Sequence, residues 1–137
     1  MKVNIGKFYA NGKQRTVKVQ VDKWDTYNVD HTLSVIALPL LKQFKESQGG
    51  CSWVDNEDVP KSMFVPDGEE YESELWGTRW THVIDEMIFA FECIADIDKQ
   101  ENYTKSIGYD VEGMRKTDER IANGLRLFGK YFRALWS

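Results

Sequence analysis

The 137-residue chain contains few of the features that mark disulfide-linked, exported or membrane proteins. Its two cysteines, Cys51 and Cys93, lie far apart and form no Cys-x-x-Cys pair. Disulfide frameworks need larger, patterned sets of cysteine, so we expect reduced thiols and a cytoplasmic protein. No apolar run approaches the roughly 20 residues that span a bilayer, and residues 1–6 lack the apolar segment of a signal peptide. We therefore expect neither a membrane partner nor export.

Sequence motifs of common catalytic and phosphate-binding sites are also missing. The chain has no GxSxG nucleophile elbow, and neither cysteine adjoins a histidine. It has no GxxxxGK[ST] loop, no strand-linked GxGxxG and no HExxH pair. A net charge of −4 disfavours generic binding to nucleic acid. These absences make an enzyme the least supported class of function, and we expect no cofactor.

The residues that are present favour a folded domain, because 42% are hydrophobic and 13% are aromatic. We predict a single domain over residues 1–137 of the α+β class, mainly α. A β-hairpin at residues 2–22 precedes a helical body at residues 23–137 that contains three helices. A long acidic loop, residues 49–74, separates the first two helices, and loops of this length tend to be functional or mobile.

Residues 2–22 show the alternation of a half-buried hairpin, with valines at every second position from 17 to 21. Asn11-Gly12 marks the turn. A three-residue loop with its glycine in the left-handed conformation pairs Val3 with Val19 and Ile5 with Val17, which keeps the apolar face intact. A lone hairpin is marginally stable in water, so we expect it to pack on the helices or on another subunit.

The first predicted helix begins at Asp30, whose carboxylate is placed to cap the first turn. Pro39 lacks an amide donor and crowds the preceding turn, so we predict a kink or a break near Val35. Gln48-Gly49-Gly50 ends the helix. Its core-facing side consists of apolar residues three and four apart: Leu33, Ile36, Ala37, Leu40, Leu41 and Phe44.

Two further helices follow the acidic loop. In the third, residues 111–135, Gly124 and Gly129 lower helix propensity, and either close approach of another backbone or simple tolerance explains them. The second helix is predicted to bury Trp76, Trp80, Val83, Ile84, Met87, Ile88, Phe91, Ile94 and Ala95, and to expose Arg79, His82, Asp85, Glu86, Glu92 and Asp96. The third is predicted to bury Met114, Ile121, Leu125, Phe128 and Phe132, with Trp136 continuing the stripe.

Charge is unevenly distributed along the chain. Residues 55–74 hold eight acids and only Lys61 as a cation, and residues 115–133 hold six cations against Asp118 and Glu119. This asymmetry allows the two segments to face each other, within one chain or between subunits, although a solvated basic face beside an acidic loop is the simpler interpretation. The acids are Asp55, Glu57, Asp58, Asp67, Glu69, Glu70, Glu72 and Glu74; the cations are Arg115, Lys116, Arg120, Arg126, Lys130 and Arg133.

A metal or acid–base site has one candidate set, namely Asp30, His31, His82, Asp85 and Glu86. His82 and Glu86 are one helical turn apart and share a face. Asp85-Glu86 followed by Glu92 and Asp96 is similar in style to the magnesium sites of all-α nucleotide pyrophosphatases, but the chain lacks their EExxE and ExxD runs. We predict no metal site, and a metal-dependent nucleotide hydrolase ranks third among the functional hypotheses.

A binding site for a nucleotide-like ligand is better supported. Tryptophan and tyrosine rings offer flat faces for a base, arginine and lysine suit phosphate, and carboxylates and amides suit ribose hydroxyls. Each of these residues also has a structural interpretation, as a core anchor or a surface ion pair. The predicted ligand-binding set is Lys23, Trp24, Asp25, Tyr27, His31, Arg79, Trp80, Glu86, Arg120, Asn123 and Arg126.

Several motifs resemble a family of small proteins from tailed bacteriophages. They are Lys23-Trp24-Asp25-Thr26-Tyr27 with Asp30-His31-Thr32-Leu33, then Leu38-Pro39-Leu40-Leu41-Lys42-Gln43, Val54-Asp55, Glu57-Asp58-Val59-Pro60, Arg79-Trp80, Asp85-Glu86-Met87-Ile88-Phe89-Ala90-Phe91-Glu92, and residues 119–131. The resemblance covers residues 20–135, and Tyr27 stands where tryptophan is usual in that family. It implies a phage origin and transfers no catalytic residue.

Two functional hypotheses follow. The first is a non-catalytic binding protein in the host cytoplasm, such as a counter-defence sponge that sequesters a nucleotide immune signal by tight binding alone. The alternative is a virion or assembly protein that acts through protein–protein contacts. We expect a homo-oligomer in either case, because the hairpin needs a partner.

Overall fold

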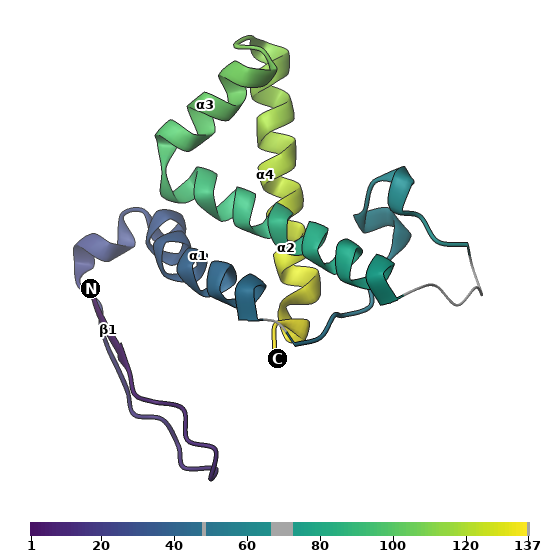
Figure 1. Cartoon of the computed structure of the whole chain (residues 1–137). Helices are drawn as coiled ribbons and strands as arrows, with labels where there is room; N and C mark the ends of the chain where they lie inside the picture. Colours follow the sequence, from purple (N-terminus) through teal and green to yellow (C-terminus); the bar gives the residue numbers. More distant parts are fainter. Residues whose placement is uncertain (48, 67–72, 137) are drawn as a thin grey trace.

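The computed structural model describes residues 1–47, 49–66 and 73–136 (Figure 1). The expected helix end at Gln48, the acids Asp67, Glu69, Glu70 and Glu72, and Tyr71 lie outside the described residues. The strands are β1 (Lys2–Ile5) and β2 (Val17–Gln20); the helices are α1 (Val29–Ser47), α2 (Ser73–Ala95), α3 (Ile97–Ile107) and α4 (Val111–Tyr131). Short 3₁₀ turns are η1 (Lys23–Thr26), η2 (Asn56–Asp58), η3 (Lys61–Met63) and η4 (Phe132–Ala134). Within this described part, no helix combines the length and apolarity needed to cross a membrane.

The hairpin has the predicted register. β1 and β2 are antiparallel, with Val3 opposite Val19 and Ile5 opposite Val17. Gly12 has φ +76°, and its amide donates to the carbonyl of Tyr9 at 3.3 Å, so the bulged turn is confirmed. The hairpin extends away from the helical body in Figure 1, and every residue of both strands is exposed. Of the two expected ways to cover its apolar face, packing on the chain's own helices is therefore wrong.

Helix α1 departs from its prediction at both Asp30 and Pro39. It starts at Val29, so Asp30 lies inside the first turn, where its charge still favours the helix dipole, rather than at the cap. The helix runs unbroken through Pro39, so the predicted break is wrong, and a bend there stays a prediction. Pro39 leaves the carbonyl of Val35 without its helical donor, and Val35 is half exposed, so water can solvate that group.

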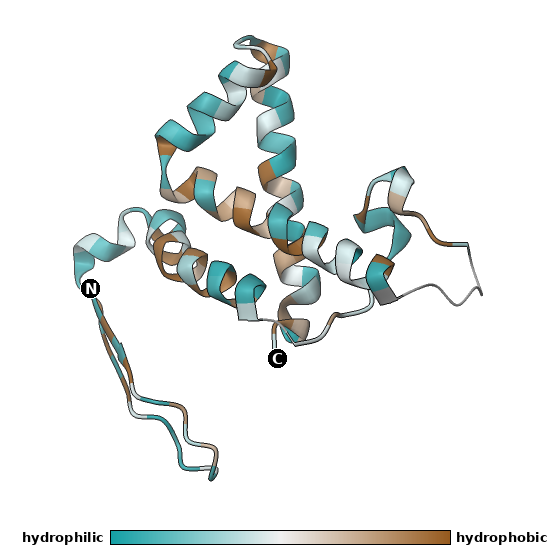
Figure 2. Cartoon of the chain, in the orientation of Figure 1, coloured by the Kyte–Doolittle hydropathy of each residue, from teal (hydrophilic) through white to brown (hydrophobic). Residues whose placement is uncertain are grey.

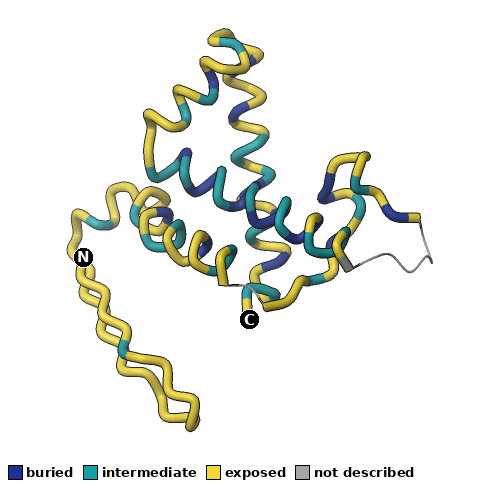
Figure 3. The backbone as a smooth tube through the Cα atoms, in the orientation of Figure 1, coloured by how far each residue is buried: buried dark blue, intermediate teal, exposed yellow. Residues whose placement is uncertain are grey.

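Helix α2 is the centre of the fold and packs against α1, α3 and α4. Its predicted apolar side is confirmed, because Trp80, Val83, Ile84, Met87 and Phe91 are buried. Figure 3 shows buried stretches along much of α2. The predicted polar side is wrong at Arg79 and Glu86, which are 3% and 9% exposed, because each is paired with groups on packed neighbouring segments.

A fourth helix, α3, was not predicted, so the expectation of three helices is wrong. Its sequence is polar along most of its length, and Thr104 is its buried residue. Local chemistry explains the helix instead: the Asp96 side chain caps it by accepting from the amide of Asp98, and Gly108 ends it with φ +128°.

Helix α4 forms where predicted, but its buried stripe differs. Met114, Leu125, Phe132 and Trp136 are exposed, whereas the buried residues are Gly113, Thr117, Gly124, Leu127 and Tyr131. A Cβ at Gly124 would collide with the Glu86 carbonyl oxygen and the Ala90 side chain, so close approach of α2 explains this glycine. Nothing lies near a Cβ built at Gly129, so tolerance explains that one.

Candidate functional site

The junction between the hairpin and α1 is fixed by its own acids. Asp22 and Asp25 form a reciprocal capping box around η1, with the Asp22 amide donating to Asp25 at 2.7 Å. The N-terminal ammonium donates to the same Asp25 carboxylate at 3.0 Å. These hydrogen bonds hold the pKa of Asp25 below its usual value. The Thr32 hydroxyl ties the turn to α1 by donating to the Asp25 carbonyl at 3.1 Å.

On this junction the Trp24 and Tyr27 rings stack, with centroids 5.2 Å apart and planes 19° apart. Trp24 is 64% exposed and Tyr27 is 74% exposed, so neither is the core anchor that the sequence allowed. The Lys23 ammonium lies 4.8 Å from the Trp24 ring centroid. We call Lys23, Trp24 and Tyr27 the aromatic face. It is flat, cationic at one edge and open to solvent.

The other members of the predicted ligand site lie elsewhere. Arg79 on α2 holds the loop over residues 54–65, donating to the Asn56 side chain at 2.9 Å, to the Met63 carbonyl at 2.6 Å and to the Val54 carbonyl. Trp80 is 1% exposed in the core. These roles keep the Arg79 guanidinium and the Trp80 ring inside the helical body.

Glu86 and Arg120 form a paired site between α2 and α4. The guanidinium makes two hydrogen bonds to the carboxylate, at 2.7 and 3.0 Å. It also lies 3.8 Å from the Phe89 ring centroid and 5.1 Å from that of Tyr103. The hydrogen bond to Glu86 raises the pKa of Arg120 despite partial burial. Arg120 therefore joins two helices, and its ring neighbours restrict access to phosphate.

The proposed histidine–carboxylate set does not assemble. His31 is exposed on α1, whereas His82 and Asp85 lie on α2. Asp85 pairs with Lys45 of α1 at 2.6 Å, and Glu86 is engaged by Arg120. In the described part of the chain, the residues that do bring three such ligand atoms within 4.8 Å of one another are Asp55, Glu57 and Asp58.

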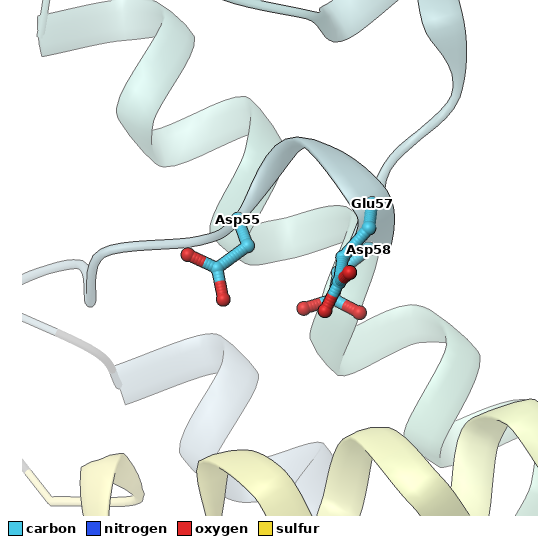
Figure 4. Close-up of side chains that lie close together, drawn as sticks. All are labelled: Asp55, Glu57 and Asp58. Atoms are coloured by element: carbon cyan, nitrogen blue, oxygen red, sulfur yellow. The ribbon is translucent and has the colours of Figure 1, made fainter. Parts of the chain in front are cut away.

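These three carboxylates surround one lysine of α4. Figure 4 shows them on the turn at η2. The Lys130 ammonium lies 2.6 Å from Asp58, 2.7 Å from Asp55 and 2.9 Å from Glu57. The ammonium thus supplies the positive charge that a metal ion would bring. We read this cluster as an internal ion-pair network and not as a metal centre.

Asp58 is the buried hub of that network, with a fully buried side chain. It accepts hydrogen bonds from the Tyr131 hydroxyl and from Arg126, each at 2.6 Å, in addition to Lys130. Burial raises the pKa of Asp58, but these three donors outweigh it, so the pKa lies below the usual value. Burial and the same contact raise the pKa of Tyr131 to about 12. The Tyr131 hydroxyl in turn accepts from the Asp55 amide at 3.1 Å.

Asn123 completes this region, because its side-chain oxygen accepts from Arg126 at 2.9 Å. The structure thus brings part of the acidic loop, Asp55, Glu57 and Asp58, against Arg126 and Lys130 of α4 within one chain, although a solvated basic face was the simpler interpretation of the sequence. Asp58, Lys130 and Tyr131 are not among the residues that the sequence pattern predicts for a site. The charge asymmetry of the two segments was the sequence signal for Asp58 and Lys130.

The two cysteines have different surroundings. Cys93 is buried, and that burial raises the pKa of its thiol. Cys51 is exposed and borders a cavity of about 310 Å³ that is also lined by Trp80 and Trp136. A second cavity of about 250 Å³ lies between α3 and α4, where Thr104 and Thr117 hydrogen-bond at 2.8 Å. Trp80 is the single member of the predicted ligand set that lines either cavity.

The eleven predicted residues therefore fall into separate groups. Lys23, Trp24, Asp25 and Tyr27 belong to the junction, and His31 lies in the first turn of α1. Arg79 and Trp80 are buried on α2, Glu86 pairs with Arg120, and Asn123 pairs with Arg126. Comparisons with protein-family models, curated proteins and solved structures give no match to the chain.

Proposed function

We propose that this chain is a phage-encoded, non-catalytic binding protein that acts through contacts with another protein, in the manner of a virion or assembly component. The observation that carries the proposal is the aromatic face, because two stacked rings are left 64% and 74% exposed on a turn that is held by a capping box. Aromatic residues are enriched in protein interfaces, and rigid ones lose little entropy on binding.

The open shape of the aromatic face and the contacts of the predicted ligand-binding arginines support a protein partner over a small anion. Ligand sites for small molecules are concave and enclose most of the ligand. The aromatic face is open, and Arg79, Arg120 and Arg126 are held in other contacts. Opening those contacts for a phosphate would leave buried carboxylates or carbonyls without donors, which is costly.

A nucleotide sponge is the second candidate function, and Lys23 is the observation that favours it. Its ammonium beside the Trp24 ring would meet a phosphate while the ring stacks on the base. A sponge built here would rest on one cation and two rings rather than on the full set predicted from sequence.

The two candidates separate in infected cells. We would measure the fraction of the chain that co-purifies with phage particles and assembly intermediates. Trp24→Ala/Tyr27→Ala should lower that fraction at least tenfold, because two anchor side chains are removed. The matched control is Tyr109→Ala/Trp136→Ala, which removes a tyrosine and a tryptophan of similar exposure elsewhere and should leave the fraction unchanged.

Absence of the wild-type chain from both fractions would reject the protein-contact proposal. The sponge would then be tested by the melting temperature of the purified chain with cyclic dinucleotides, cyclic trinucleotides and cyclic ADP-ribose isomers. A ligand-dependent rise that Trp24→Ala/Tyr27→Ala abolishes would support it, and no rise with any of these ligands would reject it.

A further inference from the structure

The N-terminal hairpin is an amphipathic arm whose apolar face lacks a cover in its own chain. In the observed register Val3, Ile5, Val17 and Val19 point to one face, and Val21 continues it. All five are between 42% and 62% exposed. Figure 2 marks hydrophobic segments along these strands, and Figure 3 draws the same strands as exposed. A two-stranded sheet of this kind needs a third strand or packing against a helix to be stable.

Helix α1 carries a second uncovered apolar surface. Val29, Leu33, Ile36 and Leu40 are spaced four, three and four residues apart, so they share one side of the helix. Val29, Leu33 and Leu40 are 49%, 58% and 67% exposed. We call these four residues the α1 stripe. The predicted core positions of Leu33, Ile36 and Leu40 are therefore wrong, because the buried residues of α1 are Ser34 and Leu41.

The arm is similar in length to the α1 stripe. The arm is also opposite in net charge to the rest of the chain. Val17 to Val21 spans about 13 Å as a strand, and Val29 to Leu40 spans about 16 Å as a helix. Residues 1–21 carry five cations and no acid, whereas residues 22–137 carry 13 cations and 22 acids. An arm of one copy is thus attracted to the body of another copy. The five cations are Lys2, Lys7, Lys13, Arg15 and Lys18.

We propose that two copies of this chain exchange hairpins, each arm laying its apolar face on the α1 stripe of the other copy. A reciprocal exchange of this type closes as a two-fold symmetric dimer and leaves no unpaired arm. In this contact the apolar face of each two-stranded sheet packs against a helix, which supplies the support that the isolated hairpin lacks. The inference goes beyond the proposed function, because the dimer forms whatever protein meets the aromatic face.

The test is native mass spectrometry and light scattering of the full chain over about two decades of concentration, since dimerisation follows mass action. The wild-type chain should be dimeric at the upper end. Val3→Lys on the arm and Leu33→Lys on the stripe should each weaken self-association more than tenfold, because each buries a charge in an apolar contact. The circular dichroism of α-helix should not change, since both positions are exposed in the single chain.

Two controls keep the charge change and move it off the proposed contact. Asn4→Lys lies on the same strand as Val3 but on the opposite face, and Val35→Lys lies on α1 away from the stripe with 50% exposure. Both controls should remain dimeric. A mixture of Val3→Lys and Leu33→Glu chains should form heterodimers more readily than either variant forms homodimers, because one of the two contacts keeps its normal arm and stripe and the other pairs opposite charges.

Three outcomes would overturn the exchange. One is a monomeric wild-type chain at every concentration. Another is a Leu33→Lys chain as dimeric as wild type, which would place the arms against each other or against a different surface. The third is failure of the mixed variants to form heterodimers more readily than either variant forms homodimers.

Discussion

Asp58 shows at the scale of one residue how the acidic loop is attached to the helices. Its buried carboxylate accepts from Arg126, Lys130 and Tyr131, all of which lie on α4. The neighbouring Glu57 also contacts Lys130 but is 73% exposed. These two neighbouring carboxylates therefore contribute very differently to stability, because Asp58 is shielded from solvent and Glu57 remains hydrated.

We expect Asp58→Asn to lower the free energy of unfolding by about 2 to 3 kcal/mol, since it leaves buried donors facing a neutral amide. Urea denaturation at neutral pH measures this change. Glu57→Gln is the matched control and should stay within about 0.5 kcal/mol of wild type. Equal effects of the two substitutions would show that the network is not centred on Asp58.

The lowered pKa of Asp58 also predicts an acid dependence of stability. A carboxyl whose pKa is lower in the folded state stabilises the fold above its unfolded pKa of about 4, and this contribution disappears as pH falls through the folded pKa. The free energy of unfolding should thus decrease below about pH 4. Asp58→Asn should make that decrease shallower. Urea denaturation at several pH values from neutral to acidic measures this, and the same dependence of the unfolding free energy on pH in both chains would argue against a lowered pKa of Asp58.

Two glycines of α4 are predicted to respond in opposite directions. Gly124→Ala forces a methyl group against the Glu86 carbonyl and Ala90, so it should destabilise the fold by about 1 to 3 kcal/mol. Gly129→Ala enters open space and should stabilise the helix by about 0.5 to 1 kcal/mol. Thermal unfolding of both variants shows whether each substitution raises or lowers stability. A more stable Gly124→Ala variant would mean that α2 and α4 lie farther apart than in this structure.

At the scale of elements, the start of α4 depends on one side chain. Asp110 accepts from the amide of Gly113 at 2.7 Å and caps the helix. Asp110→Ala should cost about 1 kcal/mol of stability, whereas Asp110→Asn should retain most of the cap. Asp118→Ala, at an exposed position within the same helix, serves as the control for loss of an acid. Chemical denaturation distinguishes these variants, and a harmless Asp110→Ala would exclude the capping role.

The elements that sequence predicts well are those whose signal is local and apolar. Valine alternation gave the register of β1 and β2, and the apolar arc of α2 identified the centre of the core. Helix α3 has no such arc, because its ends are set by Asp96 and Gly108. The buried side of α4 was mispredicted because its contact with α2 uses Gly124 and its contact with α3 uses Thr117, and hydrophobic periodicity does not detect small or polar residues.

The candidate site divides in the same way. The junction from Lys23 to Tyr27 was predicted because its residues are contiguous, so their proximity needs no knowledge of the fold. The arginines were grouped with it by chemistry alone, and their partners depend on helix packing. Asp58 meets α4 across more than 60 residues of chain, and only the charge asymmetry of the two segments anticipated that meeting.

For the whole molecule, the helical body is held together by its own ion pairs and core, whereas the N-terminal region is incomplete. The arm, the aromatic face and the α1 stripe all leave apolar groups in solvent, within 40 residues of one another. Apolar surface gathered in one region usually marks contact with another chain. Our central proposal is that a second copy of the chain covers the arm and the α1 stripe.

Hydrogen–deuterium exchange of the full chain as a function of concentration tests that claim most directly. The account predicts that amides of β1, β2 and the first half of α1 become protected together as concentration rises, and that Val3→Lys removes this protection while Asn4→Lys preserves it. Exchange in these segments that is equally fast at every concentration, while α2 and α4 stay protected, would contradict it.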